Sequence, residues 1–358
     1  MATVVLAGGG TAGHVQPALA VARQWKISHP QDRIVFLGTS SGLETILVPA
    51  AQFDLHLIPR VRISRRPSAS WLNIPFDLLS SVSASKKVIK MADVVIGFGG
   101  YVSAPAYIAA QISGVPIVIH EANAKPGWAN RLGAAFSDHL AVAHPVDSGK
   151  FEHALLTGLP LRSDVAQGFN DSQADWAASR SAAKLRLGFA ADAPLLFIMG
   201  GSQGSVAINK VIESSVELFN QQGLSVLHSV GKLNALPQAK GGYKPVAYVD
   251  AMADAYLAAD LIIGRSGAVT CSEFRALGRY ALFVPLPIGN GEQFVNAASL
   301  VADNRAQVIS QKEFTAAFLK AHISGLLAKS AAATIAGNGA DLHAAEKIVA
   351  LTQFAMKP

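Results

Sequence analysis

Short apolar runs that do not alternate with polar residues recur through the first half of the chain, with stretches of helical periodicity between them. The runs are Val4 to Ala7, Ile34 to Leu37, Val94 to Ile96, Ile117 to Ile119 and His139 to Ala143. Such runs are typical of strands buried on both faces, as in a parallel sheet covered by helices. This pattern therefore predicts a parallel α/β sheet in the first half of the chain.

The same pattern starts again in the second half. Its runs are Leu195 to Met199, Ser225 to His228, Leu261 to Gly264 and Ala281 to Val284. A restart of this kind indicates a second doubly wound domain. We therefore expect an α/β fold with two Rossmann-like domains. Ligands are expected in the cleft where the carboxyl ends of the two sheets face each other.

The boundary between the domains is expected near Gly158–Arg162, because glycine and proline concentrate there. Residues 163–182 are polar and are predicted to be a loop-rich linker. Residues 344–356 have the pattern of an amphipathic helix that could cap either domain. The predicted units are an N-terminal domain (1–162), a C-terminal domain (163–343) and a final helix (344–358), which could pack back on the N-terminal domain.

Composition narrows the range of partners. The chain has 358 residues, 51% of them hydrophobic and 15% charged, which favours two globular cores and excludes disorder. The formal net charge is +6. A positive charge favours anionic partners such as nucleotides, phosphorylated substrates or an acidic bilayer, although ordinary solubility would also explain it. We expect no nucleic acid among the partners.

The only cysteine is Cys271, so no internal disulfide can form, and no Cys/His cluster suggests a structural metal. A reducing, cytoplasmic compartment is expected. The start, Met1–Ala7, is predicted to be a strand and not a signal peptide. Long apolar runs such as 112–119 are broken by Gly114 and Pro116, so none is predicted to span a bilayer.

Three glycine-rich turns follow predicted strands and precede predicted helices. They are Gly8–His14, Gly97–Tyr101 and Gly200–Ser205. Glycine allows close approach of the backbone, and a helix N-terminus offers unpaired N–H groups and a partial positive charge. The turns therefore predict phosphate-binding sites, with room for more than one diphosphate.

The first turn has the Gly-x-Gly-x-x-Gly spacing of a dinucleotide fold. That function needs an acidic side chain at the end of the next strand, about 20 residues on. The next strand ends in Gly38-Thr39-Ser40, which contains no carboxylate. A nicotinamide-dependent oxidoreductase is therefore disfavoured.

Two segments of the second half could recognise a nucleotide sugar. Arg265–Glu273 runs from a buried strand into a helix, and Glu273 is placed where a carboxylate can bind both hydroxyls of a ribose, or where it would simply be solvated. Pro285–Asn296 is turn-rich and ends in amides, which suit sugar hydroxyls.

Five motifs together strongly resemble the MurG family of bacterial UDP-N-acetylglucosamine:lipid I N-acetylglucosaminyltransferases of peptidoglycan synthesis. They are Gly9–His14, Gly97–Tyr101, His120–Asn123, Gly200–Gly204 and Ser266–Ala268 with Glu273. The resemblance extends to about Asn296. It implies the two-domain GT-B glycosyltransferase fold, UDP-GlcNAc as donor substrate and lipid I as acceptor. It also implies peripheral attachment to the cytoplasmic face of the plasma membrane, alongside other proteins of wall synthesis.

The resemblance implies a donor bound mainly to the C-terminal domain, with Ser202 at the diphosphate, Val249 at the uracil, Glu273 at the ribose and Gln293 at the sugar. The implied donor-binding residues are Thr11, Ala12, Gly13, Asn123, Arg162, Ser202, Gln203, Gly204, Val249, Ser266, Gly267, Ala268, Val269, Thr270, Glu273 and Gln293. The acceptor is expected at Gly10, His14, Gly99, Gly100 and Tyr101. Ala122 and Glu292 replace amides that are frequent in the family, so the sugar contacts are less securely implied than the nucleotide contacts.

The implied reaction inverts the α-linked donor into a β-1,4 product by attack of the acceptor's C4 hydroxyl. His14 is the candidate general base, because neutral imidazole takes a proton well near pH 7. A structural role for its ring is the alternative. Charge on the departing UDP would be offset by a helix N-terminus and Arg162, so we expect neither a metal nor another cofactor.

A candidate membrane-docking segment is Trp71–Leu79 with Lys86, Lys87 and Lys90, which combines apolar side chains with a basic cluster. Packing of the same leucines onto the sheet is the competing explanation. Three other functions remain open from the residues alone. They are a glycosyltransferase acting on a soluble aglycone, a UDP-GlcNAc 2-epimerase and a non-catalytic nucleotide-sugar binding protein.

Overall fold

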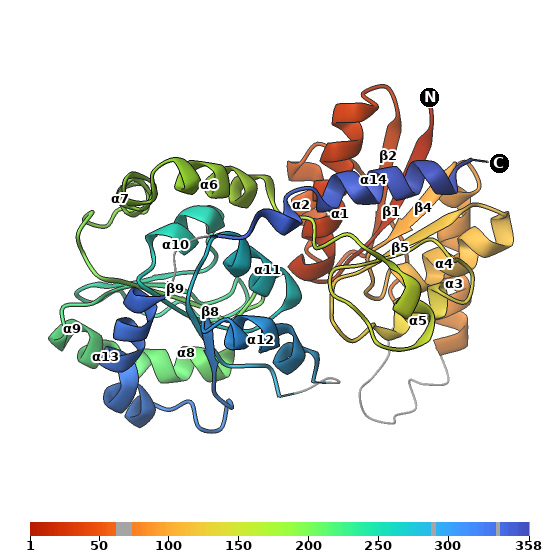
Figure 1. Cartoon of the computed structure of the whole chain (residues 1–358). Coiled ribbons are helices and arrows are strands. Elements are labelled where there is room, and N and C mark those ends of the chain that lie inside the picture. Colours follow the sequence, from red (N-terminus) through yellow and green to blue (C-terminus); the bar gives the residue numbers. More distant parts are fainter. Residues whose placement is uncertain (62–73, 288–290, 334–336, 358) are drawn as a thin grey trace. The chain divides into compact units, whose positions relative to one another are not determined.

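A computed structural model describes residues 1–61, 74–287, 291–333 and 337–357. The chain divides into two compact units (Figure 1). The first unit comprises Met1–Arg162 together with Asp341–Pro358, and the second comprises Ser163–Ala340. Each unit is built around its own parallel sheet.

The sheet of the first unit has seven parallel strands in the order β3-β2-β1-β4-β5-β6-β7. Their bounds are β1 Thr3–Ala7, β2 Arg33–Gly38, β3 Asp54–Leu57, β4 Val94–Gly97, β5 Ile117–Glu121, β6 Leu140–Val142 and β7 Leu155–Leu156. The order reverses between β1 and β4, so the connections from these two strands leave in opposite directions along the sheet. A topological switch point of this kind leaves a crevice beyond the carboxyl ends of the strands.

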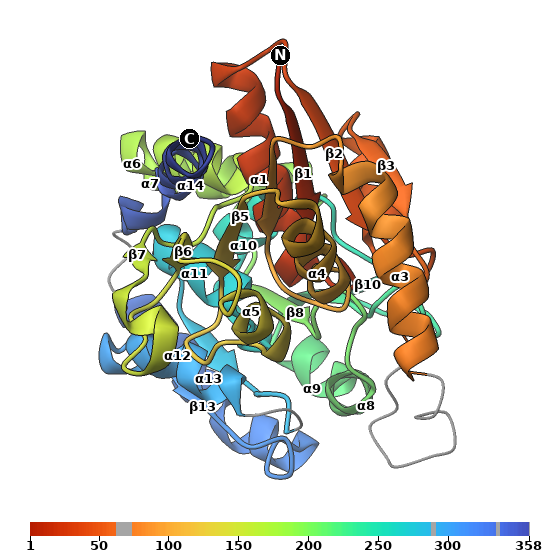
Figure 2. The same cartoon turned by 90° about the vertical axis from the view of Figure 1, so that its right-hand side faces the viewer.

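Helices cover both faces of this sheet (Figure 2). The helices of the unit are α1 Ala12–Ser28, α2 Glu44–Ala50, α3 Ile74–Ile89, α4 Ser103–Ser113, α5 Trp128–Gly133, the 3₁₀ helices η2 Gly149–His153 and η3 Gly339–Asp341, and α14 Ala344–Ala355. Helix α14 packs against α1, so the end of the chain belongs to the first unit. Of η3, only Asp341 lies in this unit.

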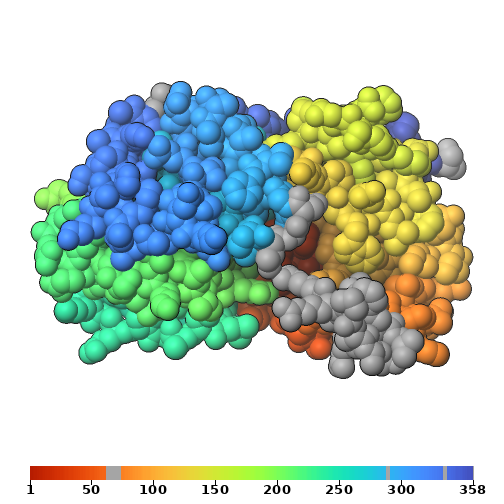
Figure 3. All heavy atoms as spheres, turned by 90° about the horizontal axis from the view of Figure 1, so that it is seen from below, coloured from red at the N-terminus to blue at the C-terminus, as the bar shows by residue number. Residues whose placement is uncertain are grey.

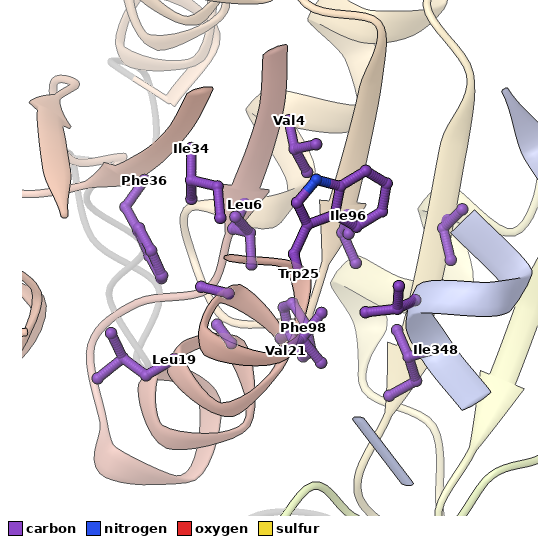
Figure 4. Packing of buried hydrophobic residues seen from close by; sticks show 14 of the residues in the cluster. Val4, Leu6, Leu19, Val21, Trp25, Ile34, Phe36, Ile96, Phe98 and Ile348 are labelled. Atoms are coloured by element: carbon purple, nitrogen blue, oxygen red, sulfur yellow. The ribbon is translucent and has the colours of Figure 1, made fainter. Parts of the chain in front are cut away.

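Side-chain alternation along each strand divides the core into two layers. Val4 and Leu6 of β1 pack with Trp25 of α1 and Ile348 of α14 on one face (Figure 4). Their neighbours Val5 and Ala7 point to the other face, towards α3 and α4. Both faces are buried, which explains why the sequence shows continuous apolar runs in place of alternation.

The sheet of the second unit has six parallel strands in the order β10-β9-β8-β11-β12-β13. Their bounds are β8 Leu195–Met199, β9 Ser225–Ser229, β10 Tyr243–Val246, β11 Leu261–Gly264, β12 Ala281–Phe283 and β13 Ala306–Val308. The switch point lies between β8 and β11. The helices are α6 Ser163–Ala174, α7 Trp176–Arg186, α8 Val206–Glu213, α9 Val216–Gln221, α10 Met252–Ala258, α11 Ala268–Ala276, α12 Glu292–Ala302 and α13 Ala316–Ala332.

The second sheet is also buried on both faces. On one face, Leu196 and Ile198 pack with apolar residues of α8, α9 and α13. Figure 3 looks onto this side, where the blue surface of α13 adjoins the green surface of α8 and α9. On the other face, Phe197 contacts Tyr256, and Tyr256 meets Phe274 edge-on with ring centroids 4.9 Å apart. Aromatic packing thus fixes α10 and α11 against the sheet.

The predicted fold class is confirmed, and all nine predicted runs are strands. Four strands were not predicted: β3, β7, β10 and β13. The prediction of a loop-rich linker at 163–182 is wrong, because this segment forms α6 and most of α7. The side chain of Asp175 caps α7 by accepting a hydrogen bond from the N–H of Ala178, and both helices pack on α10.

Candidate active site

The first glycine turn leads from β1 into α1 at the switch point of the first unit. Gly10 has a φ of +90°, a conformation that favours glycine. Its N–H donates to the carboxylate of Glu44 at 2.8 Å, and the other oxygen of Glu44 accepts the N–H of Thr39, also at 2.8 Å. Glu44 is fully buried. One amide of the predicted phosphate-binding turn is therefore already occupied by an anion of the protein itself.

The ring of His14 lies between the first two glycine turns. A Cβ atom built on Gly100 would approach its Nδ1 to 3.1 Å, and one built on Gly99 would approach its Cδ2 to 3.4 Å. The absence of a side chain at Gly100 therefore makes room for the imidazole, whereas a Cβ atom at Gly99 would make an ordinary contact with it. The structure brings together His14, Gly99 and Gly100, three of the five residues predicted to bind the acceptor.

Hydrogen bonding assigns the tautomer of His14. Its Nδ1 lies 3.2 Å from the carbonyl oxygen of Gly9 and 3.2 Å from Oγ1 of Thr11. A carbonyl oxygen can only accept, so Nδ1 carries the proton and Nε2 carries the lone pair. Among the residues that the structure describes, Nε2 has no hydrogen-bond partner. The ring is partly exposed, so this nitrogen is open to a ligand.

Burial lowers the pKa of His14 below its usual 6.5, against the opposing effects of the Glu121 charge, the Gly9 hydrogen bond and the Glu44 charge. The imidazole is therefore neutral near pH 7. A neutral ring with an open nitrogen meets the requirements of a general base.

Glu121 fixes the loop that follows β5. One of its oxygens accepts from the backbone N–H of Asn123 at 2.8 Å and from the side-chain amide of Asn123 at 3.1 Å. The other oxygen accepts from the N–H of Gly127 and the amide of Asn130. Asn130 in turn accepts a hydrogen bond from the hydroxyl of Tyr107 at 2.7 Å. Asn123, a predicted donor-binding residue, is thus held in place by a buried carboxylate.

His120 precedes Glu121 and is buried. Its Nε2 donates to the carbonyl of Gly158 at 2.9 Å, whereas its Nδ1 is buried without a hydrogen-bond partner among the described residues. Burial lowers the pKa of His120 to about 4, with a smaller contribution from His144. This histidine therefore stays neutral and has a structural position, unlike His14.

The glycine turn of the second unit connects β8 to α8. Gly201 and Gly204 have φ values of +88° and +76°. Residues that follow β9 pack against this turn. The side-chain amide of Asn234 donates to the carbonyl of Gln203 at 3.0 Å, and Gly231 approaches the same carbonyl so closely that a side chain on it would collide. The predicted residues Ser202, Gln203 and Gly204 therefore lie on a rigid turn at the N-terminus of α8.

Arg265 places a buried positive charge beside this turn. Its guanidinium donates to Oγ of Ser205 at 2.7 Å, to Oε1 of Gln311 at 2.6 Å and to the carbonyls of Val284 and Pro285. No described carboxylate pairs with it. Burial lowers the pKa of Arg265, but the guanidinium remains charged. The switch point of the second unit is therefore electropositive.

The remaining donor-site candidates surround the N-terminus of α11. Ser266 is buried and donates to the carbonyl of Gln293, whose side chain accepts from the N–H of Leu286 at 2.9 Å. A Cβ atom built on Gly267 would meet nothing within 4 Å, so space is open there. The first-turn N–H groups that follow, at Ala268, Val269 and Thr270, have no intrahelical acceptor.

Glu273 is buried in α11, and one of its oxygens accepts from the hydroxyl of Tyr256 at 2.7 Å. The simple alternative of a solvated helix glutamate is therefore wrong.

Two further donor-site candidates lie outside α11. Val249, which follows β10, is buried, and beside it the ammonium of Lys232 lies over the ring of Tyr248, 4.8 Å from the ring centroid. Arg162 ends the first unit, at the place where the chain passes into α6.

Three residues that shape the two switch points were given no role of their own from the sequence: Glu44, Tyr256 and Arg265, the last of which only begins a predicted nucleotide-sugar segment. Glu44 follows a glycine-rich loop, and side chains on Gly38 or Gly42 would collide with it. The lack of a side chain at those two glycines was its only signal. In the described part of the chain, no group of three or more His, Cys, Asp or Glu residues could hold a metal ion.

Comparison with known families matches both halves of the chain. The model described as the glycosyltransferase family 28 N-terminal domain matches residues 4–142, and that of the family 28 C-terminal domain matches residues 195–350. Each match contains the glycine turns of one sheet described above.

Curated relatives agree over most of the chain. A Corynebacterium glutamicum protein is 45% identical over 315 residues, which is 87% of this chain and 86% of the relative. A Thermobifida fusca protein is 40% identical over 368 residues, covering 98% of this chain and 94% of the relative. Each is named UDP-N-acetylglucosamine–N-acetylmuramyl-(pentapeptide) pyrophosphoryl-undecaprenol N-acetylglucosamine transferase.

Among solved structures, Acinetobacter baumannii MurG is similar with a TM-score of 0.69 and 26% identity. The match covers 99% of this chain and all of that one.

The depressed pKa of His120 predicts a specific acid sensitivity. Between pH 6.5 and about 4, the unfolded chain binds a proton at this histidine that the folded chain does not. The free energy of unfolding should therefore decrease as the pH falls through this range, by up to about 1.4 kcal/mol per pH unit for one histidine. In His120→Gln the free energy of unfolding should depend less steeply on pH, because the proton taken up by His120 on unfolding is lost. Urea titrations at several pH values measure this slope. Equal slopes in the two proteins would contradict the assignment.

Proposed function

The chain belongs to glycosyltransferase family 28, and from that premise we infer that it transfers N-acetylglucosamine from UDP-GlcNAc to lipid I. The acceptor is the C4 hydroxyl of the N-acetylmuramyl sugar, and the product is lipid II with a β-1,4 linkage. Peptidoglycan synthesis is the corresponding role. The observation that carries the residue assignment is the open Nε2 of a neutral His14 at the switch point of the first unit.

The charge at the second switch point supports binding of the donor diphosphate there. Ser202, Gln203 and Gly204 lie in the turn just before α8. The N–H groups of Val206 and Ala207 in the first turn of this helix lack intrahelical acceptors, whereas that of Ile208 donates to Oγ of Ser205. Arg265 adds a positive charge that no described carboxylate neutralises. As the bond to the sugar breaks, UDP gains negative charge, which these groups would stabilise. Arg162 is proposed to assist from the end of the first unit.

The rest of the donor is proposed to lie along α11 and the start of α12. Glu273 would bind the ribose, with its orientation fixed by Tyr256. Gln293 would bind the sugar hydroxyls through the part of its amide that does not bind Leu286. Backbone at Ser266, Gly267, Ala268, Val269 and Thr270 would approach the nucleotide, and Val249 would border the uracil. Thr11, Ala12, Gly13 and Asn123 of the first unit complete the proposed donor contacts.

His14 is proposed as the general base. Nε2 would accept the proton of the C4 hydroxyl as its oxygen attacks the anomeric carbon from the face opposite UDP. Nδ1 keeps its own proton on the carbonyl of Gly9, so the resulting imidazolium is stabilised by the same hydrogen bond. The charges of Glu121 and Glu44 favour that imidazolium as well, since both raise the pKa of the ring. Attack on the face opposite the leaving group inverts the anomeric centre.

Helix α3 supports docking to an anionic membrane. Phe76 and Leu79 are exposed by 72% and 67%, which leaves them free of the core, whereas Leu78 is partly buried against it. Lys86, Lys87 and Lys90 at the end of the helix are exposed. Trp71 and Leu72 lie outside the described residues. No helix in the described part of the chain is long and apolar enough to cross a bilayer. We propose peripheral attachment through α3 at the cytoplasmic face of the membrane.

Acceptor-dependent release of UDP is the direct test of this function. The protein is incubated with UDP-GlcNAc, with and without a lipid I analogue, and both UDP and the sugar product are followed. UDP should appear only with the acceptor, together with a β-1,4-linked disaccharide. Formation of UDP-ManNAc without acceptor would indicate an epimerase instead, and transfer only to a soluble aglycone would indicate the other glycosyltransferase class.

Replacing His14 separates its proposed role from simple binding. In His14→Ala, kcat should fall by roughly 10²–10⁴-fold, while the KM for UDP-GlcNAc changes little, because the ring acts on the acceptor hydroxyl. In the unaltered protein the acidic limb of the kcat profile should lie below pH 6.5, since burial lowers the pKa of this ring. His29→Ala, at the other end of α1, is the control. Equal losses in kcat and donor affinity would argue against the base.

Reversing the charge of the α3 lysines tests membrane docking. The triple variant Lys86→Glu, Lys87→Glu, Lys90→Glu should bind anionic vesicles more weakly in a sedimentation assay, by roughly 1 kcal/mol per lysine that lies near the surface. The same change at Lys312, Lys320 and Lys329, which are exposed in the second unit, alters the net charge equally and should affect binding less. Equal binding of the two triple variants would contradict a docking role for α3.

A further inference from the structure

An acceptor with a pyrophosphate needs positive charge near the first switch point, and this requirement rests on the proposed function. The glycine turn itself supplies little of it. The N–H of Gly10 is bound to the carboxylate of Glu44 at 2.8 Å. The charges of Glu44 and Glu121 both reach the ring of His14, where they raise its pKa. Two buried carboxylates thus oppose the binding of a second anion at this turn, unless a cation lies nearby.

Arg60 is such a cation. It follows β3 by three residues, and its guanidinium lies over the ring of Tyr101, with Cζ 5.8 Å from the ring centroid. One of its nitrogens donates to Oγ of Ser41 at 3.2 Å. Neither contact neutralises the charge, and no described carboxylate pairs with Arg60. Arg60 is exposed, and Tyr101 is 38% exposed.

The position of this pair follows from the order of the strands. β3 and β4 are separated in the sheet by β2 and β1, so three inter-strand spacings put their carboxyl ends about 14 Å apart. The contact between Arg60 and Tyr101 bridges this distance. The first glycine turn emerges from β1, one of the two strands that the contact spans. Tyr101 directly follows Gly100, and a side chain on Gly100 would touch His14. The cation therefore lies on the same edge of the sheet as the proposed base.

We propose that Arg60, held over the ring of Tyr101, binds the pyrophosphate of the acceptor. A guanidinium stacked on an aromatic ring keeps its edge N–H groups in one plane, where they can donate to two phosphate oxygens. Ser41 uses one of these donors and fixes the orientation of that plane. In this arrangement Tyr101 is a positioning residue for Arg60, and the glycine turn orients His14 instead of binding the anion through Gly10.

The test measures acceptor and donor kinetics separately in the full-length protein. In Arg60→Gln, the KM for a lipid I analogue should rise by about ten- to a hundredfold, while the KM for UDP-GlcNAc stays within twofold. Arg60→Lys should recover part of the loss, because it keeps the charge but not the planar fork. Tyr101→Leu, which removes the ring under the guanidinium, should resemble Arg60→Gln, and Tyr101→Phe, which keeps the ring, should raise the acceptor KM less than Tyr101→Leu does. Arg33→Gln, which breaks an exposed ion pair with Asp54 at the amino end of the same sheet, is the control.

Acceptor analogues then identify the anion. With an analogue that carries one phosphate in place of the pyrophosphate, the difference between Arg60→Gln and the unaltered protein should shrink several-fold. If the difference persists with this analogue and disappears when the peptide is removed, Arg60 binds peptide carboxylates and the proposal is wrong. An unchanged acceptor KM in Arg60→Gln would also overturn it. If the unaltered protein itself lacks acceptor-dependent UDP release, the proposed function fails, and this proposal fails with it.

Discussion

The imidazole of His14 packs closely against residue 100, which has no side chain: a Cβ atom there would lie 3.1 Å from Nδ1 of the ring and 2.7 Å from the carbonyl oxygen of Gly9. This steric constraint brings Nδ1 to the carbonyl of Gly9 and leaves Nε2 open. The reversal of strand order between β1 and β4 supplies the crevice, and the glycines after each of these strands supply the space for the ring. The order of the strands and the missing side chain at residue 100 thus allow the hydrogen bond to Gly9 that puts the proton on Nδ1 and leaves Nε2 open.

The two units share a topology but differ in electrostatics at their switch points. In the first, the buried carboxylates Glu44 and Glu121 bind backbone and amide N–H groups and favour a positive charge on His14. In the second, Arg265 brings a buried positive charge to the glycine turn without a described carboxylate. The first environment suits a group that gains a proton, and the second suits a leaving group that gains negative charge.

The sequence predicts the buried parts of this structure well and its edges poorly. Central strands are continuous apolar runs, but β10 reads Tyr-Lys-Pro-Val and lies at the edge of its sheet, and β3 is a partly exposed edge strand with alternating polar residues. Helices α6 and α7 were missed because their polar composition resembles a linker. Glu44 could not be assigned either. Its contact with Gly10 joins residues 34 positions apart and depends on how two loops pack.

Determining the tautomer of His14 tests this account most directly. The ¹⁵N chemical shifts of its two ring nitrogens, recorded by NMR on histidine-labelled protein at pH 7.5, distinguish a protonated nitrogen from one with a lone pair. We expect a neutral ring with the proton on Nδ1 and the lone pair on Nε2. A proton on Nε2, or a ring that is charged at this pH, would contradict the proposed base and the hydrogen bond to Gly9 from which it follows.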